Sequence, residues 1–246
     1  MSEPKIVILD NATALCAHAA EEIAYFAGEA VCTHGEFTLC LSGGTTPAAI
    51  YEMLGSKFQF SIAWKEIQLF WGDERCVPPD DPASNFAMTQ RTLLSKLTLE
   101  PSQVHRIPGE KTPDDAAHAY EDELRSHFGL GEGEFPRFDV MLLGLGENSH
   151  TASLFPGSAA IHENERIALA VDVDDPTQRH RVTITPPVIN NAARIFFLAS
   201  GASKAQAVWN ILKGPRDVDK FPAQVVAPDN GEVIWLLDKA AASMIA

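Results

Sequence analysis

Residues 37–54 read FTLCLSGGTTPAAIYEML and place a buried strand, a glycine-rich turn and a helix in direct succession. Phe37–Leu41 is a continuous apolar run of strand length, and Ser42–Pro47 opens a helix that we expect to continue through Leu54. Continuous apolar strands, unlike alternating ones, are typical of parallel sheets whose two faces are both covered. This stretch therefore predicts an α/β fold.

The same succession of strand and helix recurs along the chain. Apolar strands are predicted at residues 5–9, 67–71, 138–143, 167–173, 182–185, 195–199 and 233–237, and helices between residues 11 and 35 and at 86–96, 113–128 and 203–213. The glycine-rich residues 129–136 are the one candidate linker, and because the alternation continues beyond them we expect a surface loop. The pattern predicts a single domain over residues 1–246 with a doubly wound, mostly parallel sheet and helices on both faces.

Composition narrows the class of protein. The chain has 246 residues, with 19 Lys and Arg against 33 Asp and Glu, and a formal net charge of −14 at pH 7. No basic run opposes this charge, so we expect no nucleic-acid partner. The first residues show no leader pattern, and no apolar run reaches the ~18 residues that a membrane span needs. The 4 cysteines form no Cys-x-x-Cys pair, and we expect a cytoplasmic protein with reduced thiols.

The turn at Ser42–Pro47 has the features of an anion site. Gly43 and Gly44 let the backbone approach a ligand closely, and unpaired N–H groups at the start of the helix point outward. Such a nest attracts a phosphate or a carboxylate. The Gly-Lys-Ser/Thr ending of a Walker loop is missing, and a tight turn with a hydroxyl cap would explain the same residues without a ligand.

A second glycine-rich turn, Gly144–His150, follows the most apolar strand. Ser149 stands where a dinucleotide fingerprint has its third glycine, so no nicotinamide cofactor is expected. His150 is expected at or near the start of a helix. A lone histidine is more often structural, but its usual pKa of about 6.5 makes it the natural proton carrier at this edge of the sheet. No two histidines have the i, i+4 spacing of a helical zinc site, and no metal is expected.

Chemically unusual residues follow four of the predicted strands, at residues 42–47, 72–75, 144–150 and 200–204. Ligands of an open parallel sheet bind beyond the carboxyl ends of its strands, so we expect these segments to converge. Arg75, Arg181 and Lys204 would supply the local positive charge that an anionic ligand needs on a chain with this net charge.

Five stretches run in the order of one known family: Leu41–Pro47 (LSGGTTP), Phe70–Pro79 (FWGDERCVPP) with Ser84 and Asn85, Gly146–Gly157 (GENSHTASLFPG), His180–Thr185 (HRVTIT) and Ser200–Lys204 (SGASK). Together they resemble the 6-phosphogluconolactonase family over nearly the whole chain. The resemblance implies a carboxylic ester hydrolase that converts 6-phospho-D-glucono-1,5-lactone to 6-phospho-D-gluconate in the oxidative pentose phosphate pathway, without a cofactor.

Carried over residue by residue, the resemblance assigns roles to named side chains. His150 would take a proton from the water that attacks the lactone carbonyl and return it to the ring oxygen. Arg75 would face the developing negative charge or the sugar hydroxyls. The residues expected to bind the substrate, with its phosphate on the glycine turn and the last two cations, are Ser42, Gly43, Gly44, Thr45, Asp73, Arg181 and Lys204. Whether Asp73 and Glu74 bind hydroxyls or brace Arg75 stays open.

One position departs from the family pattern. The family reads Gly-x-Asp-Gly-His, whereas this chain has Gly146-Glu-Asn-Ser-His150, so Asn148 replaces a carboxylate. Asn148 can offer the imidazole only a neutral hydrogen bond, which is roughly half as strong as a charged one. We therefore expect Asn148 to support a working but less basic His150.

Two other functions remain open from the sequence. The related sugar-phosphate isomerase-deaminases carry Tyr where Arg75 stands and Glu where this chain has Phe155, so the acid that supports ring opening is missing. A non-catalytic sugar-phosphate sensor on the same scaffold would bind without turnover, and Asn148 favours it. The expected partner is a phosphorylated sugar lactone, bound by a monomer or a weak homo-oligomer.

Overall fold

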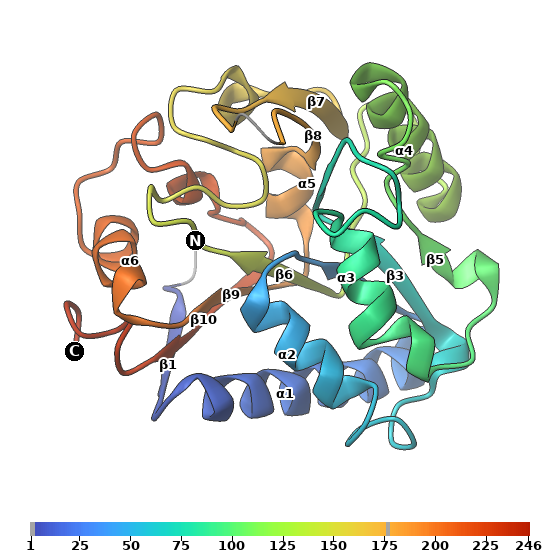
Figure 1. Ribbon diagram of the computed structural model, residues 1–246, viewed down its shortest axis with the longest axis horizontal. Helices are drawn as coiled ribbons and strands as arrows, with labels where there is room; N and C mark the ends of the chain where they lie inside the picture. The colour runs from blue at the N-terminus through green and yellow to red at the C-terminus, as the bar shows by residue number, and fades with distance from the viewer. Residues whose placement is uncertain (1–2, 176–177) are drawn as a thin grey trace.

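A seven-stranded parallel sheet forms the centre of the computed structural model, which describes residues 3–175 and 178–246 (Figure 1). Its strands are Lys5–Leu9 (β1), Phe37–Leu41 (β2), Ile67–Trp71 (β3), Val104–His105 (β5), Val140–Gly144 (β6), Arg194–Ala199 (β9) and Glu232–Asp238 (β10). The spatial order is β1-β10-β9-β6-β2-β3-β5, and each neighbouring pair is parallel. The predicted α/β fold with a mostly parallel sheet is confirmed.

Helices flank the sheet, with α1 and α2 on one side and α5 on the other (Figure 1). The α-helices are Ala12–His34 (α1), Thr45–Leu54 (α2), Asn85–Thr92 (α3), Pro113–Phe128 (α4), Pro186–Asn191 (α5) and Ala205–Leu212 (α6). Short 3-10 helices are Trp64–Glu66, Leu94–Lys96, Pro101–Gln103, Ala159–His162, Ala202–Lys204 and Pro222–Val225. The side chain of Asn11 accepts a hydrogen bond from the N–H of Ala14 and starts α1, and Gly35 ends it at a φ of 88°.

Three strands form a second, antiparallel sheet beside the first. They are Asp73–Arg75 (β4), Ala168–Asp172 (β7) and His180–Ile184 (β8), in the order β4-β8-β7. The sequence predicts strands near the last two, but it predicts no strand at residues 73–75. All three residues of β4 are charged, so no apolar run marks the strand, and its structure comes from pairing with β8.

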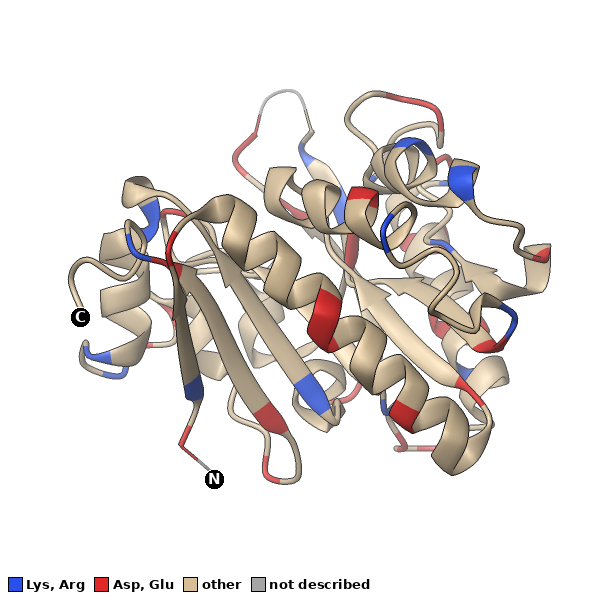
Figure 2. Cartoon of the chain, turned by 90° about the horizontal axis from the view of Figure 1, so that it is seen from below, with Lys and Arg blue, Asp and Glu red and all other residues tan. Residues whose placement is uncertain are grey.

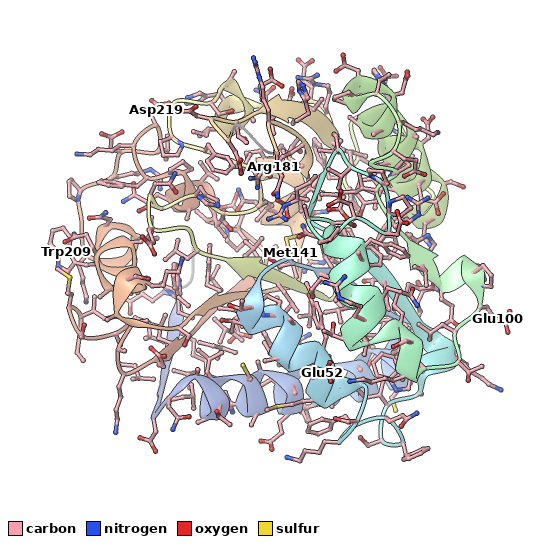
Figure 3. All side chains as sticks on the ribbon, viewed as in Figure 1. Glu52, Glu100, Met141, Arg181, Trp209 and Asp219 are labelled. Carbon is pink, nitrogen blue, oxygen red and sulfur yellow. The ribbon has the colours of Figure 1, made fainter. Side chains whose placement is uncertain are left out.

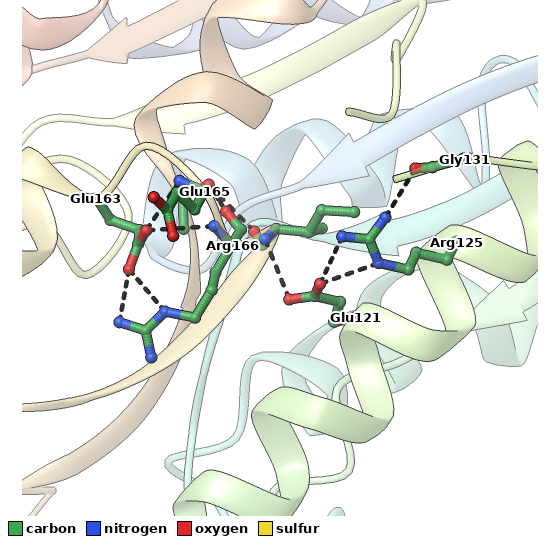
Figure 4. Close-up of polar contacts among 8 residues, drawn as sticks. Glu121, Arg125, Gly131, Glu163, Glu165 and Arg166 are labelled. Atoms are coloured by element: carbon green, nitrogen blue, oxygen red, sulfur yellow. Dashed lines mark hydrogen bonds and ion pairs between the residues drawn. The ribbon is translucent and has the colours of Figure 1, made fainter. Parts of the chain in front are cut away.

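A polar network joins α4 to the small sheet (Figure 4). One carboxylate oxygen of Glu121 accepts hydrogen bonds from Nε and Nη2 of Arg125, and the other accepts from the N–H of Ile167, just before β7. Glu163 accepts hydrogen bonds from three successive backbone N–H groups and from the guanidinium of Arg166. These contacts fix the segment that leads into β7.

Charged residues of the neighbouring strands β1, β9 and β10 lie at their ends. Lys5, Arg194 and Glu232 are the first residues of these strands, and the interiors that follow them are uncharged (Figure 2). In β9 and β10 these interiors are buried, which removes apolar surface from water without the cost of burying a charge. Among the described residues, no helix is long and apolar enough to cross a membrane.

The strand order reverses between β2 and β6. From β2 the chain adds β3 and β5 on one side, and later β6, β9 and β10 on the other. The two central strands are held in register by the pairs Leu39 with Val140 and Cys40 with Met141. Connections that leave in opposite directions open a crevice at the carboxyl ends of such strands. The fold therefore places a ligand site beyond residues 41 and 144.

Candidate active site

A pocket of about 280 Å³ opens at the crevice between β2 and β6. Its lining combines backbone amides, three cations, one carboxylate and one imidazole, from Ser42, Gly43, Gly44, Thr45, Thr46, Pro47, Asp73, Arg75, Asn85, Gly144, Leu145, Gly146, His150, Ala152, Arg181, Leu198, Ser200 and Lys204. All four segments singled out in the sequence contribute to it. Of the predicted site residues, Asn148 is the one outside the lining, and its side chain contacts His150.

The β2–α2 turn, Ser42–Pro47, presents backbone to the pocket. Gly44 precedes α2 with φ 108°, and no side chain of the described residues caps this helix. The hydroxyl cap that would explain the turn without a ligand is therefore missing, and the N–H groups of the first helical turn are left for an anion. The buried hydroxyl of Tyr51 accepts from the N–H of Ser42 and donates to its carbonyl, both at 2.9 Å, which holds the turn to α2.

Asn85 connects this turn to β4. Its Nδ2 donates to the backbone oxygen of Asp73 at 2.9 Å and to the carboxylate at 3.3 Å. A Cβ added at Gly43 would lie 2.0 Å from Oδ1 of Asn85, so the close approach requires glycine. Asn85 belongs to one of the family motifs in the sequence, but the resemblance assigns it no role. The sequence feature that could have placed Asn85 is Ser84, whose hydroxyl caps α3 and so fixes Asn85 as the first residue of that helix.

Asp73 and Glu74, which the sequence left undecided, have different surroundings. Asp73 lines the pocket, and its Oδ2 accepts a hydrogen bond from the hydroxyl of Ser153 at 2.7 Å. Glu74 is only 3% exposed, and burial raises its pKa above the usual value. Its carboxylate accepts four hydrogen bonds, from the N–H groups of residues 75, 85 and 86 and from the hydroxyl of Ser84. Glu74 therefore braces the wall of the pocket, while Asp73 faces its interior.

His150 ends a closed turn after β6, and the prediction of a helix start at this position is wrong. The N–H of Gly146 donates to the carbonyl of His150 at 2.8 Å, and the N–H of Ser149 donates to the carbonyl of Gly146 at 2.9 Å. Ser149 has a φ of 68°, a left-handed conformation that does not continue into a right-handed helix. The turn therefore presents the imidazole itself, and no helix terminus, to the pocket.

The imidazole of His150 is held as a neutral base. Its Nδ1 lies 2.5 Å from Oδ1 of Asn148, and the backbone N–H of His150 donates to the same oxygen at 3.3 Å. Because an amide oxygen only accepts, Nδ1 carries the proton and Nε2 keeps its lone pair. Burial lowers the pKa of His150 to about 4; Asp73 opposes this shift, and the three cations of the pocket add to it. The ring is thus uncharged at neutral pH.

The three cations approach the pocket from different elements. Arg75 on β4 pairs across the small sheet with Arg181 on β8, which the sequence had placed just before that strand. In the view of Figure 3, Arg181 lies between the small sheet and Met141 of β6. Burial, and then the charge of Arg75, lowers the pKa of Arg181 below its usual value. Lys204 immediately precedes α6. Their positive charge makes the pocket suited to an anion.

No group of three or more His, Cys, Asp or Glu side chains in residues 3–175 and 178–246 is arranged to hold a metal ion.

Residues 10–235 match the family described as glucosamine-6-phosphate isomerases/6-phosphogluconolactonase. The chain belongs to this family. It is 37% identical over 239 residues to the 6-phosphogluconolactonase of Synechocystis sp., covering 97% of both chains, and 36% identical over 237 residues to that of Nostoc sp., covering 96% of both. The family resemblance seen in the sequence motifs is confirmed.

The fold is shared with solved members of the family. The structure of 6-phosphogluconolactonase from Trypanosoma cruzi superimposes with a TM-score of 0.89 at 29% identity, over 100% of this chain and 98% of that one.

Proposed function

We propose that this chain is a 6-phosphogluconolactonase, an enzyme that hydrolyses 6-phospho-D-glucono-1,5-lactone to 6-phospho-D-gluconate in the oxidative pentose phosphate pathway. One structural observation supports this proposal independently of the family resemblance. The pocket combines a neutral imidazole with a glycine-rich turn and three cations, and neither Nε2 of the imidazole nor the amides of Gly43, Gly44 and Thr45 have a hydrogen-bond partner among the described residues. A phosphorylated ester needs both parts, a base for the water and a positive anchor for the phosphate.

The reaction follows from the protonation state of His150. Nε2 takes a proton from water as the water oxygen attacks the lactone carbonyl carbon, and the carbonyl oxygen becomes negatively charged in the tetrahedral intermediate. Arg75 stabilises that charge. When the intermediate collapses, the bond between the carbonyl carbon and the ring oxygen breaks, and His150 returns its proton to the departing oxygen. A positioned base of this kind contributes a rate factor of typically ~10²–10⁴.

The phosphate is the orienting group. The amides of Gly43, Gly44 and Thr45 at the start of α2, with Arg181 and Lys204, bind it far from the reacting carbonyl. Anchoring one end of the substrate converts binding free energy into orientation at the other end. Ser42 and Asp73 line the same pocket and bind the sugar between the two ends.

Two competing functions make different predictions for the same pocket. Isomerisation with loss of ammonia needs an acid beside the histidine, and the side chain against His150 is Phe155. A sensor needs only binding, and the uncharged Asn148 is the residue that favours it. Release of ammonia from glucosamine 6-phosphate, or binding of 6-phosphogluconate without turnover of the lactone, would replace the proposal.

The decisive experiment follows acid release from freshly generated 6-phosphogluconolactone above the spontaneous rate. Wild type should exceed the background, and His150→Ala should lose roughly 10²–10⁴-fold in kcat. Lys204→Ala should raise KM more than it lowers kcat, because it removes an anchor and leaves the base in place. A wild-type rate equal to the background, or a fully active His150→Ala, would exclude the mechanism.

We also propose that the enzyme acts as a monomer or weak homo-oligomer in the cytoplasm. The imidazole, the three cations and the turn amides that the proposed reaction uses all belong to this pocket, so the reaction as proposed calls on no residue of a second subunit. The four cysteines are free thiols, which fits a reducing compartment. Light scattering on the purified protein across a range of concentrations tests the first statement.

A further inference from the structure

Phe155 contacts the proposed base but has no part in the mechanism above. Its ring stacks on the imidazole of His150, with centroids 4.1 Å apart and planes 20° from parallel. The guanidinium carbon of Arg181 lies 5.3 Å from the centre of the same phenyl ring. Phe155 is half-buried and packs against the hydrophobic core, so its position is fixed from behind. One aromatic ring thus touches both the proposed base and a proposed phosphate anchor.

A local fold-back creates this contact. The N–H of Leu154 donates to the carbonyl of Thr151 at 3.0 Å, and Ala152 between them has a left-handed φ of 47°. The hydroxyl of Thr151 donates to the carbonyl of Gly144 at 2.9 Å, which ties the fold-back to the end of β6. The chain therefore reverses after His150 and returns Phe155 alongside it. A left-handed alanine is uncommon and persists only where the surrounding structure requires it.

The hydrogen bonds of His150 do not fix its ring by themselves. In the described part of the chain, Asn148 is the one side chain that bonds to the imidazole, and it holds Nδ1. A single bond at one edge leaves the ring free to tilt about that edge. General-base catalysis requires the lone pair of Nε2 to lie within hydrogen-bond reach of the attacking water and to point toward it. A second contact, on the face of the ring, is needed to set its plane.

We propose that Phe155 is a positioning residue for His150: its ring fixes the plane of the imidazole so that Nε2 points into the pocket, and it shields that face from water. The inference rests on the proposed function, in which His150 is the base. Offset and nearly parallel aromatic rings attract each other, and a phenyl face also favours the imidazolium that forms when the base accepts its proton.

Shielding by Phe155 has a consequence for the pH dependence. Burial is the main reason why the pKa of His150 falls to about 4. The charged groups that act on the imidazole are Asp73 and Arg75 from β4, Arg181 from β8 and Lys204 before α6; the carboxylate raises its pKa and the cations lower it. None of them is removed by a substitution at position 155. Loss of the ring therefore lets water reach the imidazole, and its pKa moves up toward the usual value of about 6.5.

The test compares Phe155→Leu, which keeps an apolar side chain but removes the ring, with Phe155→Tyr, which keeps the ring. For Phe155→Leu we expect kcat to fall about tenfold, equivalent to about 1.4 kcal/mol, and the acid limb of the kcat/KM profile to move to higher pH. KM should change less than about threefold, because Arg181 keeps its contacts with the carbonyl of Gln178 and the carboxylate of Asp175. Phe155→Tyr should retain the wild-type kcat and profile.

A matched control is Phe58→Leu. Phe58 is also half-buried against the core, and the ammonium of Lys57 lies 5.1 Å from its ring centre, but neither the imidazole of His150 nor the guanidinium of Arg181, which both pack on Phe155, contacts its ring. Its loss should leave kcat and the pH profile unchanged. The pKa of His150, followed by NMR of the ring in each folded variant, measures the shift directly and separates it from a general loss of structure.

A double variant separates the two proposals. If Phe155 acts through His150, adding Phe155→Leu to His150→Ala should cause no further loss of rate. A wild-type kcat and acid limb in Phe155→Leu, or an additive loss in the double variant, would overturn the positioning role while a dead His150→Ala still supports the base. A fully active His150→Ala would overturn the proposed function itself.

Discussion

The two glycine-rich turns of the pocket leave adjacent strands of one sheet, yet they present different chemistry. The β2–α2 turn runs into a helix and offers backbone N–H groups that no side chain of the described residues caps. The β6 turn, Gly144–His150, closes on itself and offers the side chain of His150. Each depends on one glycine, because a Cβ at Gly43 would collide with Asn85 and a Cβ at Gly146 would lie 2.1 Å from Nδ1 of His150. In the proposed mechanism, the first turn binds the phosphate and the second supplies the base.

Among variants that test this comparison of the turns, the largest loss of kcat should come from Gly146→Ala. The added methyl group must displace the imidazole from Asn148, and a displacement of about 1 Å is enough to cost roughly 100-fold in kcat. KM should change little because the β2–α2 turn is untouched. Steady-state kinetics on freshly generated lactone measure both constants. The control is Gly144→Ala in the same turn, where the nearest atom to an added Cβ is Oγ of Ser42 at 3.8 Å. Equal losses in the two variants would contradict this account.

The next effect should come from Gly43→Ala. An added Cβ would lie 2.0 Å from Oδ1 of Asn85, so the backbone must move and its amides must leave the phosphate. Hydrogen bonds to a charged group contribute about 1.5–3 kcal/mol, which corresponds to an increase in KM of roughly 10–100-fold. Here kcat should change less than KM. Adding Asn85→Ala removes the collision and should restore part of the affinity. A lower kcat with an unchanged KM in Gly43→Ala would contradict the assignment of phosphate binding to this turn.

A smaller change should follow Asn148→Asp. A carboxylate beside Nδ1 stabilises the imidazolium, so the pKa of His150 rises from about 4. Because the protonated ring cannot act as a base, the acid limb of the pH–rate profile should move to higher pH, by about 1–2 units. Substrate binding at the other turn should stay the same. Steady-state kinetics between pH 4 and pH 9 measure the shift. An acid limb at the same pH as in the wild type would show that Asn148 does not control the pKa of His150.

The smallest effect should come from Ser149→Gly, which should raise the free energy of unfolding and leave kcat and KM unchanged. Ser149 has a left-handed φ of 68°, and its buried hydroxyl has no hydrogen-bond partner in the described residues. The left-handed conformation costs a non-glycine residue about 1–2 kcal/mol, part of which glycine loses again through the entropy of the unfolded chain. We expect a gain of about 1 kcal/mol and a rise in Tm of about 2–4 °C. Calorimetry measures it, and a lower Tm would show that the hydroxyl is bound.

The sequence predicted the convergence at the pocket because the ends of parallel strands meet by geometry. That rule was enough to place the residues that follow β2, β3, β6 and β9 at the pocket. It did not predict that Asp73–Arg75, which follow β3, form the strand β4, because these charged residues carry no apolar pattern and depend on pairing with β8. From the sequence, Phe155 was noted only as the residue that stands where the isomerase-deaminases have Glu. Its contact with His150 depends on a chain reversal at Ala152, which no local sequence pattern predicts. Contacts made by tertiary structure were thus the ones that local reasoning missed.

The carboxylate of Glu74 has a consequence for how the pocket meets its ligand. Its hydrogen bonds reach residue 75 at one end and residues 84–86 at the other, so one buried carboxylate holds together the two ends of the loop between them. This side of the pocket is therefore assembled during folding, and an arriving sugar phosphate has little backbone left to order. More of the contact free energy then remains available for aligning the ester with the attacking water.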